Sequence, residues 1–449
     1  MTEQSTIVGG GLAGSLLAIY LARRGHEVTV YESRPDLRIE DLDAGRSINL
    51  ALAARGIAAL REVGVMDRVE PLLLPMRGRM IHDLDGSTSL QPYGIRDDEV
   101  IYSVSRPALT ALLLDAAEAT GRVRVVFDQR CVGGDLDDGV LRFRDYRGGD
   151  EYSVEVGTVY GTDGSGSAVR DLIAAAEGAE VTIDALDHSY KELTLPAGPD
   201  GGFLVDPGAL HIWPRSEYML IALPNVDGSF TCTLFLATDG EPSFATLVDP
   251  ASVRRVFETE FADFVAVTPD YVEQFFENPT GNLATVRCDN WAYRDRAVIL
   301  GDAAHAIVPF HGQGMNAAFE SCDRLDEWLD DPDRARAFQA FQDSRKPDTD
   351  AIARMALDNY VQMRSSVIDE RYLLKRAVAL ELERRQPDRF IPRYSLVMFH
   401  TIPYAQAFER AERQDRILEQ LVRGVDSPAD VDFEAADRML ADQEAGPTG

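Results

Sequence analysis

The sequence predicts an α/β protein in three parts: a Rossmann-like parallel sheet, an antiparallel β-sheet and a C-terminal helical region. The parallel part follows from the pattern Gly9-x-Gly11-x-x-Gly14, which directly succeeds a β-branched run and opens an apolar helical stretch. Between about residues 185 and 280, apolar runs alternate with turn sequences such as Asp227-Gly228, which is typical of an antiparallel sheet. From about residue 334 the chain is rich in Ala, Arg, Glu and Leu, which favours helices.

The glycine pattern predicts a dinucleotide-binding turn. Its first glycine allows the tight turn, the second admits a pyrophosphate close to the backbone, and the third lets the helix pack on the strand. Leu12 and Ala13 lie at the helix start, where free amides meet phosphate charge. A second strand over residues 27–31 delivers Glu32, about 18 residues after Gly14, to accept hydrogen bonds from an adenosine ribose. A glycine-rich turn without a ligand is the alternative, and this pattern alone leaves NAD and FAD both open.

Two further segments point to FAD. Residues 159–164 end a predicted strand at Asp163, and residues 297–302 form an unbroken apolar run, typical of a buried parallel strand, that ends at Asp302. Ligands meet the carboxyl ends of such strands, and Asp302 suits the hydroxyls of a ribityl chain. The glycine-hinged loop over residues 309–316 opens a helix whose free amides suit the N1–O2 side of a reduced flavin. Each segment alone is equally consistent with a strand-ending turn.

Composition limits the partners. The net charge of −30 argues against nucleic acid and anionic membranes, and it requires a local basic patch for any anionic nicotinamide cofactor. The four cysteines and seven histidines show no paired or ligand spacing, so we expect neither a disulfide framework nor a metal site. The first strand begins close to the start of the chain, and no apolar stretch is long enough to span a membrane. We therefore expect a cytoplasmic protein.

Periodicity and turn residues predict the remaining elements. Strands are expected over residues 123–127, 140–143, 152–160, 210–213, 218–223 and 230–235. In the helical region, breaks are expected at Pro347, Pro387, Pro392 and Pro403. We expect an FAD-binding domain over residues 1–75, 103–183 and 284–333, a substrate-binding β-sheet domain over 76–102 and 184–283, and a helical region over 334–449.

The three segments together resemble the class A flavoprotein monooxygenases. Further matching stretches are residues 45–52, 76–82, 92–94, 103–106, 210–215, 229–235, 301–316, 358–364 and 390–399, of which 301–316 is the most family-specific. The match is strongest to members that hydroxylate an aromatic amino acid. It implies that bound FAD is reduced by NADPH, a transient co-substrate for which NADH is the alternative, and then reacts with O2 to give a C4a-hydroperoxide that hydroxylates the ring. A homodimer is one possible assembly.

The resemblance also implies residue roles. Arg79, Tyr93, Asn359 and Tyr394 match positions that hold the amino-acid end of the substrate. The pocket around the aromatic ring matches Leu210, Ile221, Leu223, Phe235, Pro309, Phe310, His311 and Met363. With the motif residues, the predicted FAD site comprises Gly9, Gly11, Leu12, Ala13, Gly14, Glu32, Arg46, Ala51, Arg106, Asp163, Asp302, Gly314, Met315 and Asn316. Two departures bear on ring preference and coupling: His311 where some members carry phenylalanine, and Gln362 where many carry glutamate.

Without the family, these residues also allow plainer interpretations. A guanidinium at position 79 suits bidentate carboxylate capture, but also a solvated strand position. Tyr93 suits ordinary packing, and a loop histidine such as His311 is often on the surface. Asn359 and Met363 lie four apart, as on any helix face. No titratable pair stands out as a general acid–base couple, which suits chemistry that a cofactor carries.

Three other functions stay open. One is a hydroxylase of the same class that acts on a substituted aromatic amino acid or on a phenolic acid such as salicylate. Another is a flavin reductase or dehydrogenase that inserts no oxygen. The third is a nucleotide-sensing module without turnover.

Overall fold

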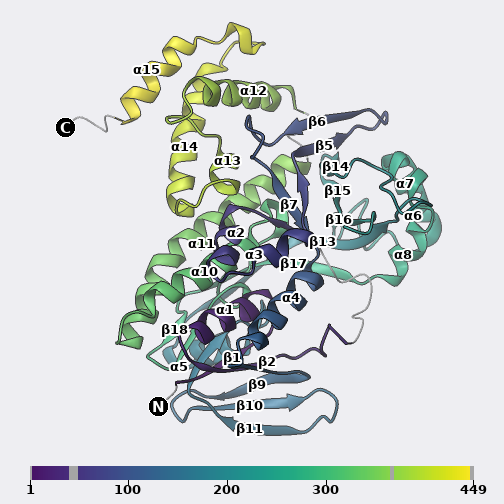
Figure 1. Cartoon of the computed structure of the whole chain (residues 1–449). Helices are drawn as coiled ribbons and strands as arrows, with labels where there is room; N and C mark the ends of the chain where they lie inside the picture. Colours follow the sequence, from purple (N-terminus) through teal and green to yellow (C-terminus); the bar gives the residue numbers. More distant parts are fainter. Residues whose placement is uncertain (1–2, 40–48, 365–368, 445–449) are drawn as a thin grey trace.

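A six-stranded sheet in the order β18-β19-β12-β1-β2-β8 carries the glycine pattern at the end of its strand β1. The computed structural model describes residues 3–39, 49–364 and 369–444, and Figure 1 shows their arrangement. All neighbours pair in parallel except β18 and β19. The Rossmann-like prediction is confirmed. The strands are β1 (Gln4–Val8), β2 (Glu27–Tyr31), β8 (Val123–Val126), β12 (Thr158–Gly161), β18 (Ala292–Tyr293) and β19 (Ala297–Ile299).

Apolar helices cover this sheet. Leu16, Leu17 and Leu21 of α1 are fully buried, and they join the sheet residues Ile7 and Val30 in one core. Burial of this kind supplies most of the stability of a helix in a globular protein. The helices of this part are α1 (Leu12–Arg23), α2 (Ala54–Glu62), α3 (Met66–Val69), α4 (Arg106–Ala119), α5 (Ala168–Glu177), α9 (Asp302–His305) and α10 (Gly314–Trp328).

The single strand predicted over residues 152–160 is wrong. It is two strands in different sheets: β11 (Glu151–Glu155) pairs with β10, whereas β12 belongs to the six-stranded sheet. Gly157 lies between them, so close to β1 that an added Cβ would lie 2.6 Å from the carbonyl oxygen of Gln4. The chain therefore leaves one sheet and enters the other at this glycine. The smaller sheet contains β9 (Gln129–Asp135), β10 (Val140–Asp145) and β11.

A seven-stranded sheet forms the second large layer, in the order β17-β13-β16-β15-β14-β5-β6. Its pairs are antiparallel, as predicted, except for the parallel pair β14–β5. A further small sheet orders β3 (Leu50–Leu52), β7 (Ile101–Val104) and β4 (Leu74–Met76). The strands of the large sheet are β5 (Gly78–His82), β6 (Thr88–Pro92), β13 (Val181–Leu195), β14 (Leu210–Arg215), β15 (Tyr218–Pro224), β16 (Phe230–Ala237) and β17 (Thr280–Cys288).

Alternation along these strands separates the two faces of the sheet. Leu220 and Ala222 join one core with the side chains of α6 (Pro250–Glu260), α7 (Ala262–Val267) and α8 (Tyr271–Glu277). These three helices flank the sheet in Figure 1. Met219 and Leu223, which alternate with Leu220 and Ala222 along β15, join a different core that includes residues of α11. This is the two-residue period expected of a strand buried on both faces.

The C-terminal helices confirm three of the four predicted breaks. α12 (Glu370–Arg385) ends before Pro387, α13 (Arg393–Met398) follows Pro392, and α14 (Tyr404–Leu421) follows Pro403; α15 (Phe433–Glu444) comes last. The break predicted at Pro347 is wrong, because α11 (Arg334–Arg364) runs through it. Arg345 pairs with Glu320 of α10, and Asp348 accepts a hydrogen bond from the Ala405 amide of α14. These tertiary contacts on both sides of the proline offset its local cost.

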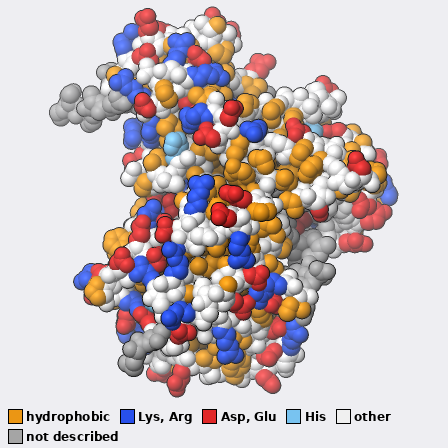
Figure 2. Space-filling model, viewed as in Figure 1, with side chains coloured by type: hydrophobic (Ala, Val, Ile, Leu, Met, Phe, Trp, Pro, Cys, Tyr) orange, Lys and Arg blue, Asp and Glu red, His pale blue; other side chains and the backbone are white. Residues whose placement is uncertain are grey.

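The expected domain boundaries stay a prediction, although each large sheet draws its strands mainly from the ranges assigned to one part, with β17 running past residue 283 to Cys288. Within the described residues, no helix is long and apolar enough to cross a membrane. On the face in Figure 2, Lys and Arg side chains are interspersed with Asp and Glu. The large negative charge is therefore not gathered there into one region.

Candidate active site

A cavity of about 270 Å³ lies where the end of β1, the start of α10 and the seven-stranded sheet meet. It brings together segments that are remote in sequence, from Gly11 to Met398. Of the predicted FAD site, Gly11, Leu12, Ala13, Ala51, Arg106, Asp302, Gly314 and Met315 line it. Of the predicted substrate site, Arg79, Asn359, Tyr394, Leu210, Ile221, Leu223, Phe235, Pro309, Phe310, His311 and Met363 line it.

The glycine turn leaves no room for a side chain at its first and third glycines. A Cβ on Gly14 would lie 1.9 Å from the carbonyl oxygen of Gly9, and one on Gly9 would lie 2.5 Å from that of Thr162. Gly9 also has φ +100°, which side chains rarely allow. Neither glycine lines the cavity; they hold the turn that brings Gly11 to it. Because the N-cap Gly11 has no capping side chain, the first amides of α1 keep their capacity to bind an anion.

Glu32 lies at the end of β2, buried beside the glycine turn. Its carboxylate accepts hydrogen bonds from the Gly10 amide at 2.8 Å and from Nε of Arg34 at 2.8 Å. Burial acts to raise the pKa of Glu32, but the hydrogen bonds and charge of Arg34 and the Gly10 amide bring it below its usual value. Glu32 does not line the cavity, so its predicted contact with the adenosine stays a prediction.

The two strand-ending aspartates differ in their environments. Asp163 does not line the cavity; it accepts hydrogen bonds from the Ser167 hydroxyl and the Ala168 amide, and thereby holds the start of α5. Its neighbours Thr162 and Gly164 line the cavity instead. Asp302 lines the cavity. Desolvation by the surrounding protein raises the pKa of its carboxyl group, although the positive charge of Arg106 acts in the opposite direction. Asp302 is therefore the aspartate placed to meet a ligand.

Asn316 fastens the start of α10 to the neighbouring strand without lining the cavity. Its side chain accepts from the Ala53 amide at 2.9 Å and donates to the carbonyl oxygens of Ala51 at 2.8 Å and Gly312 at 2.9 Å. Gly312 has φ +64°, and a Cβ there would lie 3.0 Å from that of Ala51. The short turn η2 (Pro309–His311) ends at this glycine. Asn316 thus keeps strand β3 and the α10 loop in fixed positions on one side of the cavity.

One end of the cavity is polar. Arg79 is 6% exposed and donates a hydrogen bond to Oδ1 of Asn359 over 3.3 Å. Its guanidinium carbon lies 4.9 Å from the centroid of the Tyr394 ring, and its Nε has no hydrogen-bond partner. Tyr93 stacks on Tyr394 at 4.8 Å but does not line the cavity. A buried cation with an unused donor at this end fits a carboxylate ligand.

The remaining wall is apolar and aromatic. Phe310 stacks on Tyr360 with ring centroids 3.9 Å apart, and Phe235 meets Phe310 edge-on at 4.9 Å. His311 is buried, stacks on Tyr394 at 5.6 Å and has no partner at Nδ1. Burial lowers the pKa of His311 to about 3, so its imidazole is neutral near pH 7. This wall suits an aromatic ring.

Sequence reasoning missed several residues that line the cavity: Ile101, Met219, Thr233, Ile307 and Met398. Met219 and Thr233 lie two residues from the predicted Ile221 and Phe235, so the strand period contained the signal for them. Met398 lies four residues after Tyr394 on α13, which the helix period would have placed on the same face. Arg46 lies outside the described residues. Within the described residues, no cluster of three or more His, Cys, Asp and Glu side chains is arranged to hold a metal ion.

These features fit FAD: a side-chain-free turn with uncapped amides, an aspartate facing the cavity and a second uncapped helix start at α10. The model of a family described as FAD binding domain matches residues 2–359. In fold, the chain is similar to the tetrameric form of 2-methyl-3-hydroxypyridine-5-carboxylic acid oxygenase, with a TM-score of 0.66, 20% identity, and coverage of 85% of this chain and 98% of the other. The family match and the cavity define an FAD-dependent enzyme of this fold, so the predicted FAD cofactor is confirmed.

Two named relatives narrow the class. The chain is 47% identical over 436 residues to kynurenine 3-monooxygenase of Myxococcus xanthus (strain DK1622), covering 97% of this chain and 94% of the relative. It is also 47% identical to kynurenine 3-monooxygenase of Stenotrophomonas maltophilia (strain K279a), covering 97% and 96%. The chain belongs to the kynurenine 3-monooxygenase family.

Proposed function

We propose that this protein hydroxylates L-kynurenine to 3-hydroxykynurenine with bound FAD, NADPH and O2. The observation that carries the proposal is a cavity with a buried arginine at one end, aromatic and aliphatic side chains around the rest, and the two helix starts of an FAD-binding fold on its border. The family supports the same conclusion. L-Kynurenine is an amino acid joined to an aminophenyl ketone, so it has one charged and one aromatic end.

The charged end would lie at Arg79. The guanidinium is held by Asn359, which in turn donates to the carbonyl oxygen of Phe310 over 2.6 Å. Because Arg79 is buried, its attraction for a carboxylate is little screened by water. Tyr394 borders the same space, and Tyr93 supports Tyr394 from behind. These residues would fix the amino-acid end, which determines which ring carbon faces the reacting oxygen.

The aromatic end would lie among Leu210, Leu223 and Phe235 of the seven-stranded sheet and Phe310 of the loop after β19. An apolar wall excludes water, which protects a reactive oxygen species from hydrolysis and side reactions. FAD would be held by the amides at the start of α1, by Asp302 and by the segment from Gly312 to Met315. When bound, it supplies the hydride acceptance from NADPH and the activation of O2, and the protein supplies position and dryness.

Other expectations also belong to the proposal. The chain shows one glycine fingerprint, so NADPH would visit without a Rossmann domain of its own. The cytoplasmic location and the homodimer stay predictions.

The test is aerobic turnover of the FAD-loaded protein with NADPH, analysed by mass spectrometry, together with peroxide measurement. We expect L-kynurenine to gain one oxygen atom, with about one product formed per NADPH consumed. Salicylate, which has no amino group, serves as the competing compound. If salicylate is hydroxylated and L-kynurenine is not, the substrate is wrong. If oxidation of NADPH is matched by an equal amount of hydrogen peroxide formed from O2, with neither compound changed, the protein is a reductase or oxidase.

A further inference from the structure

The residue just before α10 is held by the C-terminal helices. Gln313 is fully buried, and its side-chain oxygen accepts a hydrogen bond from the Tyr404 hydroxyl at 2.6 Å. Its side-chain nitrogen donates to Sδ of Met398 at 3.0 Å. Tyr404 opens α14 and Met398 closes α13, so both contacts reach across from the C-terminal region. Both polar ends of a fully buried amide are therefore fixed by this region.

Tyr404 is itself fixed, by Arg55. The guanidinium carbon of Arg55 lies 3.8 Å from the centroid of the Tyr404 ring, a cation–π contact in a fully buried place. Arg55 also donates hydrogen bonds to the carbonyl oxygens of Val397, at 2.5 Å, and Ile402. These two carbonyls flank the turn between α13 and α14. Arg55 therefore fixes the Tyr404 ring relative to helix α2, to which Arg55 belongs.

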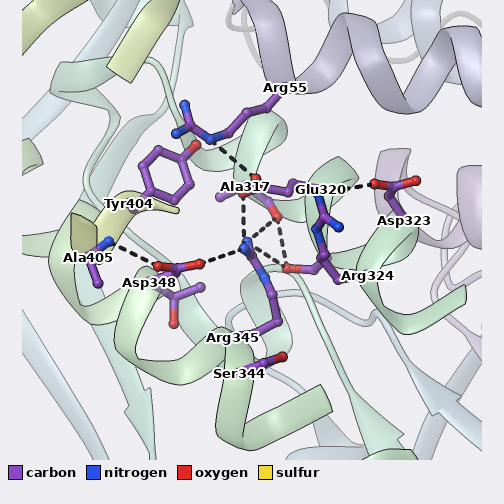
Figure 3. A network of polar contacts seen from close by, with 12 residues as sticks. Arg55, Ala317, Glu320, Asp323, Arg324, Ser344, Arg345, Asp348, Tyr404 and Ala405 are labelled. Atoms are coloured by element: carbon purple, nitrogen blue, oxygen red, sulfur yellow. Dashed lines mark hydrogen bonds and ion pairs between the residues drawn. The ribbon is translucent and has the colours of Figure 1, made fainter. Parts of the chain in front are cut away.

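A buried group of opposite charges anchors this arrangement, and Figure 3 shows it. Glu320 lies 3.3 Å from Nε of Arg55 and 3.0 Å from the guanidinium of Arg345. Arg345 in turn pairs with Asp348 at 3.2 Å, and Asp348 accepts from the amide of Ala405, next to Tyr404. Buried ion pairs of this kind contribute little net stability, and here they join α2, α10 and α11 to the start of α14.

The geometry points to Tyr404 as a positioning residue for FAD, acting through Gln313. The neighbours of Gln313 on both sides, Gly312 and Gly314, line the cavity, as does Met315. These are the residues whose backbone the FAD site requires at the start of α10. We propose that the Tyr404 hydroxyl holds the Gln313 side chain, and that this contact orients the backbone from Gly312 to Met315 for binding FAD. The inference requires FAD binding alone and not the substrate proposed above, so the two fail independently.

The test is FAD affinity, measured by quenching of flavin fluorescence when the apoprotein is titrated. Tyr404→Phe keeps the ring and its contact with Arg55 but leaves the buried Gln313 oxygen without a donor. Because an unpaired buried polar group is costly, we expect the Kd for FAD to rise about tenfold as the loop moves to satisfy it. Gln313→Leu should also weaken FAD binding. The double variant Tyr404→Phe/Gln313→Leu leaves neither group unpaired and should recover most of the affinity.

Tyr293→Phe is the matched control, because its hydroxyl donates to Asp137 at 2.8 Å and neither residue lines the cavity. Its FAD affinity should equal that of the parent protein. An unchanged Kd in Tyr404→Phe, with thermal stability lowered equally with and without FAD, would show a structural role only and overturn the inference. The inference would also be overturned if the two losses of FAD affinity added in the double variant, because Tyr404 would then act by a route other than Gln313.

Discussion

The Arg79 guanidinium on β5 donates a hydrogen bond to Oδ1 of Asn359 on α11 over 3.3 Å, joining two elements 280 residues apart in sequence. Asn359 is itself oriented by the carbonyl oxygen of Phe310. These contacts thus connect the seven-stranded sheet, helix α11 and the loop after β19 at the polar end of the cavity. The Nε of Arg79 has no hydrogen-bond partner, so this donor remains for a ligand.

Replacing Arg79 with alanine should weaken L-kynurenine binding by about 2–4 kcal/mol, because the carboxylate loses its partner in a buried site. The measurement is the Kd from equilibrium binding to the oxidised, FAD-loaded variant. Arg77→Ala is the control: Arg77 lies two residues before Arg79, its side chain is exposed, and that side chain donates to the carbonyl oxygen of Asp97. A Kd that moves equally in both variants, or in neither, rejects Arg79 as the anchor.

The glycine turn gives a steric prediction. In Gly14→Ala the new methyl group meets the carbonyl oxygen of Gly9 at 1.9 Å, so the turn has to shift. We expect FAD affinity to fall at least about tenfold, measured by titration of the apoprotein. In Gly166→Ala, by contrast, the new Cβ meets nothing within 4 Å, and affinity should be unchanged. Equal affinities in both variants would mean that FAD does not use this turn.

How much of this could be predicted from the sequence depends on how local each signal is. The Rossmann-like strands and the glycine turn were predictable because their patterns lie within a few residues of one another. The family resemblance added Arg79, Asn359 and Tyr394, which the structure brings to one end of the cavity although they come from three different elements. No periodicity in the sequence contains that juxtaposition, since tertiary packing alone creates it.

The wrong expectations have the same origin. Pro347 has the local chemistry of a helix break, but contacts of Arg345 and Asp348 with other helices hold α11 continuous. The predicted strand over residues 152–160 contains a change of sheet at Gly157, which the pairing of β11 and β12 with different strands reveals. Asp163 ends a strand as Asp302 does, yet its carboxylate is used within the protein. Burial and partners, which separate these two aspartates, are properties of the fold.

The buried carboxyl of Glu383 predicts a pH dependence of stability. Burial, and then the negative charge of Glu99, raise the pKa of Glu383 to about 7 from 4.5, although Arg96 and Arg384 act in the opposite direction. The folded state therefore binds this proton more tightly than the unfolded state, so stability falls as pH rises from about 4.5 to about 7. The loss is roughly 3 kcal/mol across this window.

Glu383→Gln should remove that loss, because both carboxyl oxygens lack hydrogen-bond partners and a neutral amide requires no ionisation. The variant should unfold at higher denaturant concentration than the parent at pH 8, with a smaller difference at pH 5. Glu381→Gln on the same helix is the control, since its carboxylate is paired with Arg385 and its pKa is lowered. A Glu383→Gln variant less stable than the parent at pH 8 would contradict the prediction.

The central claim is that the flavin and an aromatic amino acid occupy one cavity. Anaerobic stopped-flow reduction of the FAD-loaded protein by NADPH, with and without L-kynurenine, tests it most directly. We predict that L-kynurenine accelerates bleaching of the flavin, and that admitting air then yields 3-hydroxykynurenine. The same bleaching rate with and without L-kynurenine, followed by recovery of the compound unchanged after air is admitted, would contradict the account.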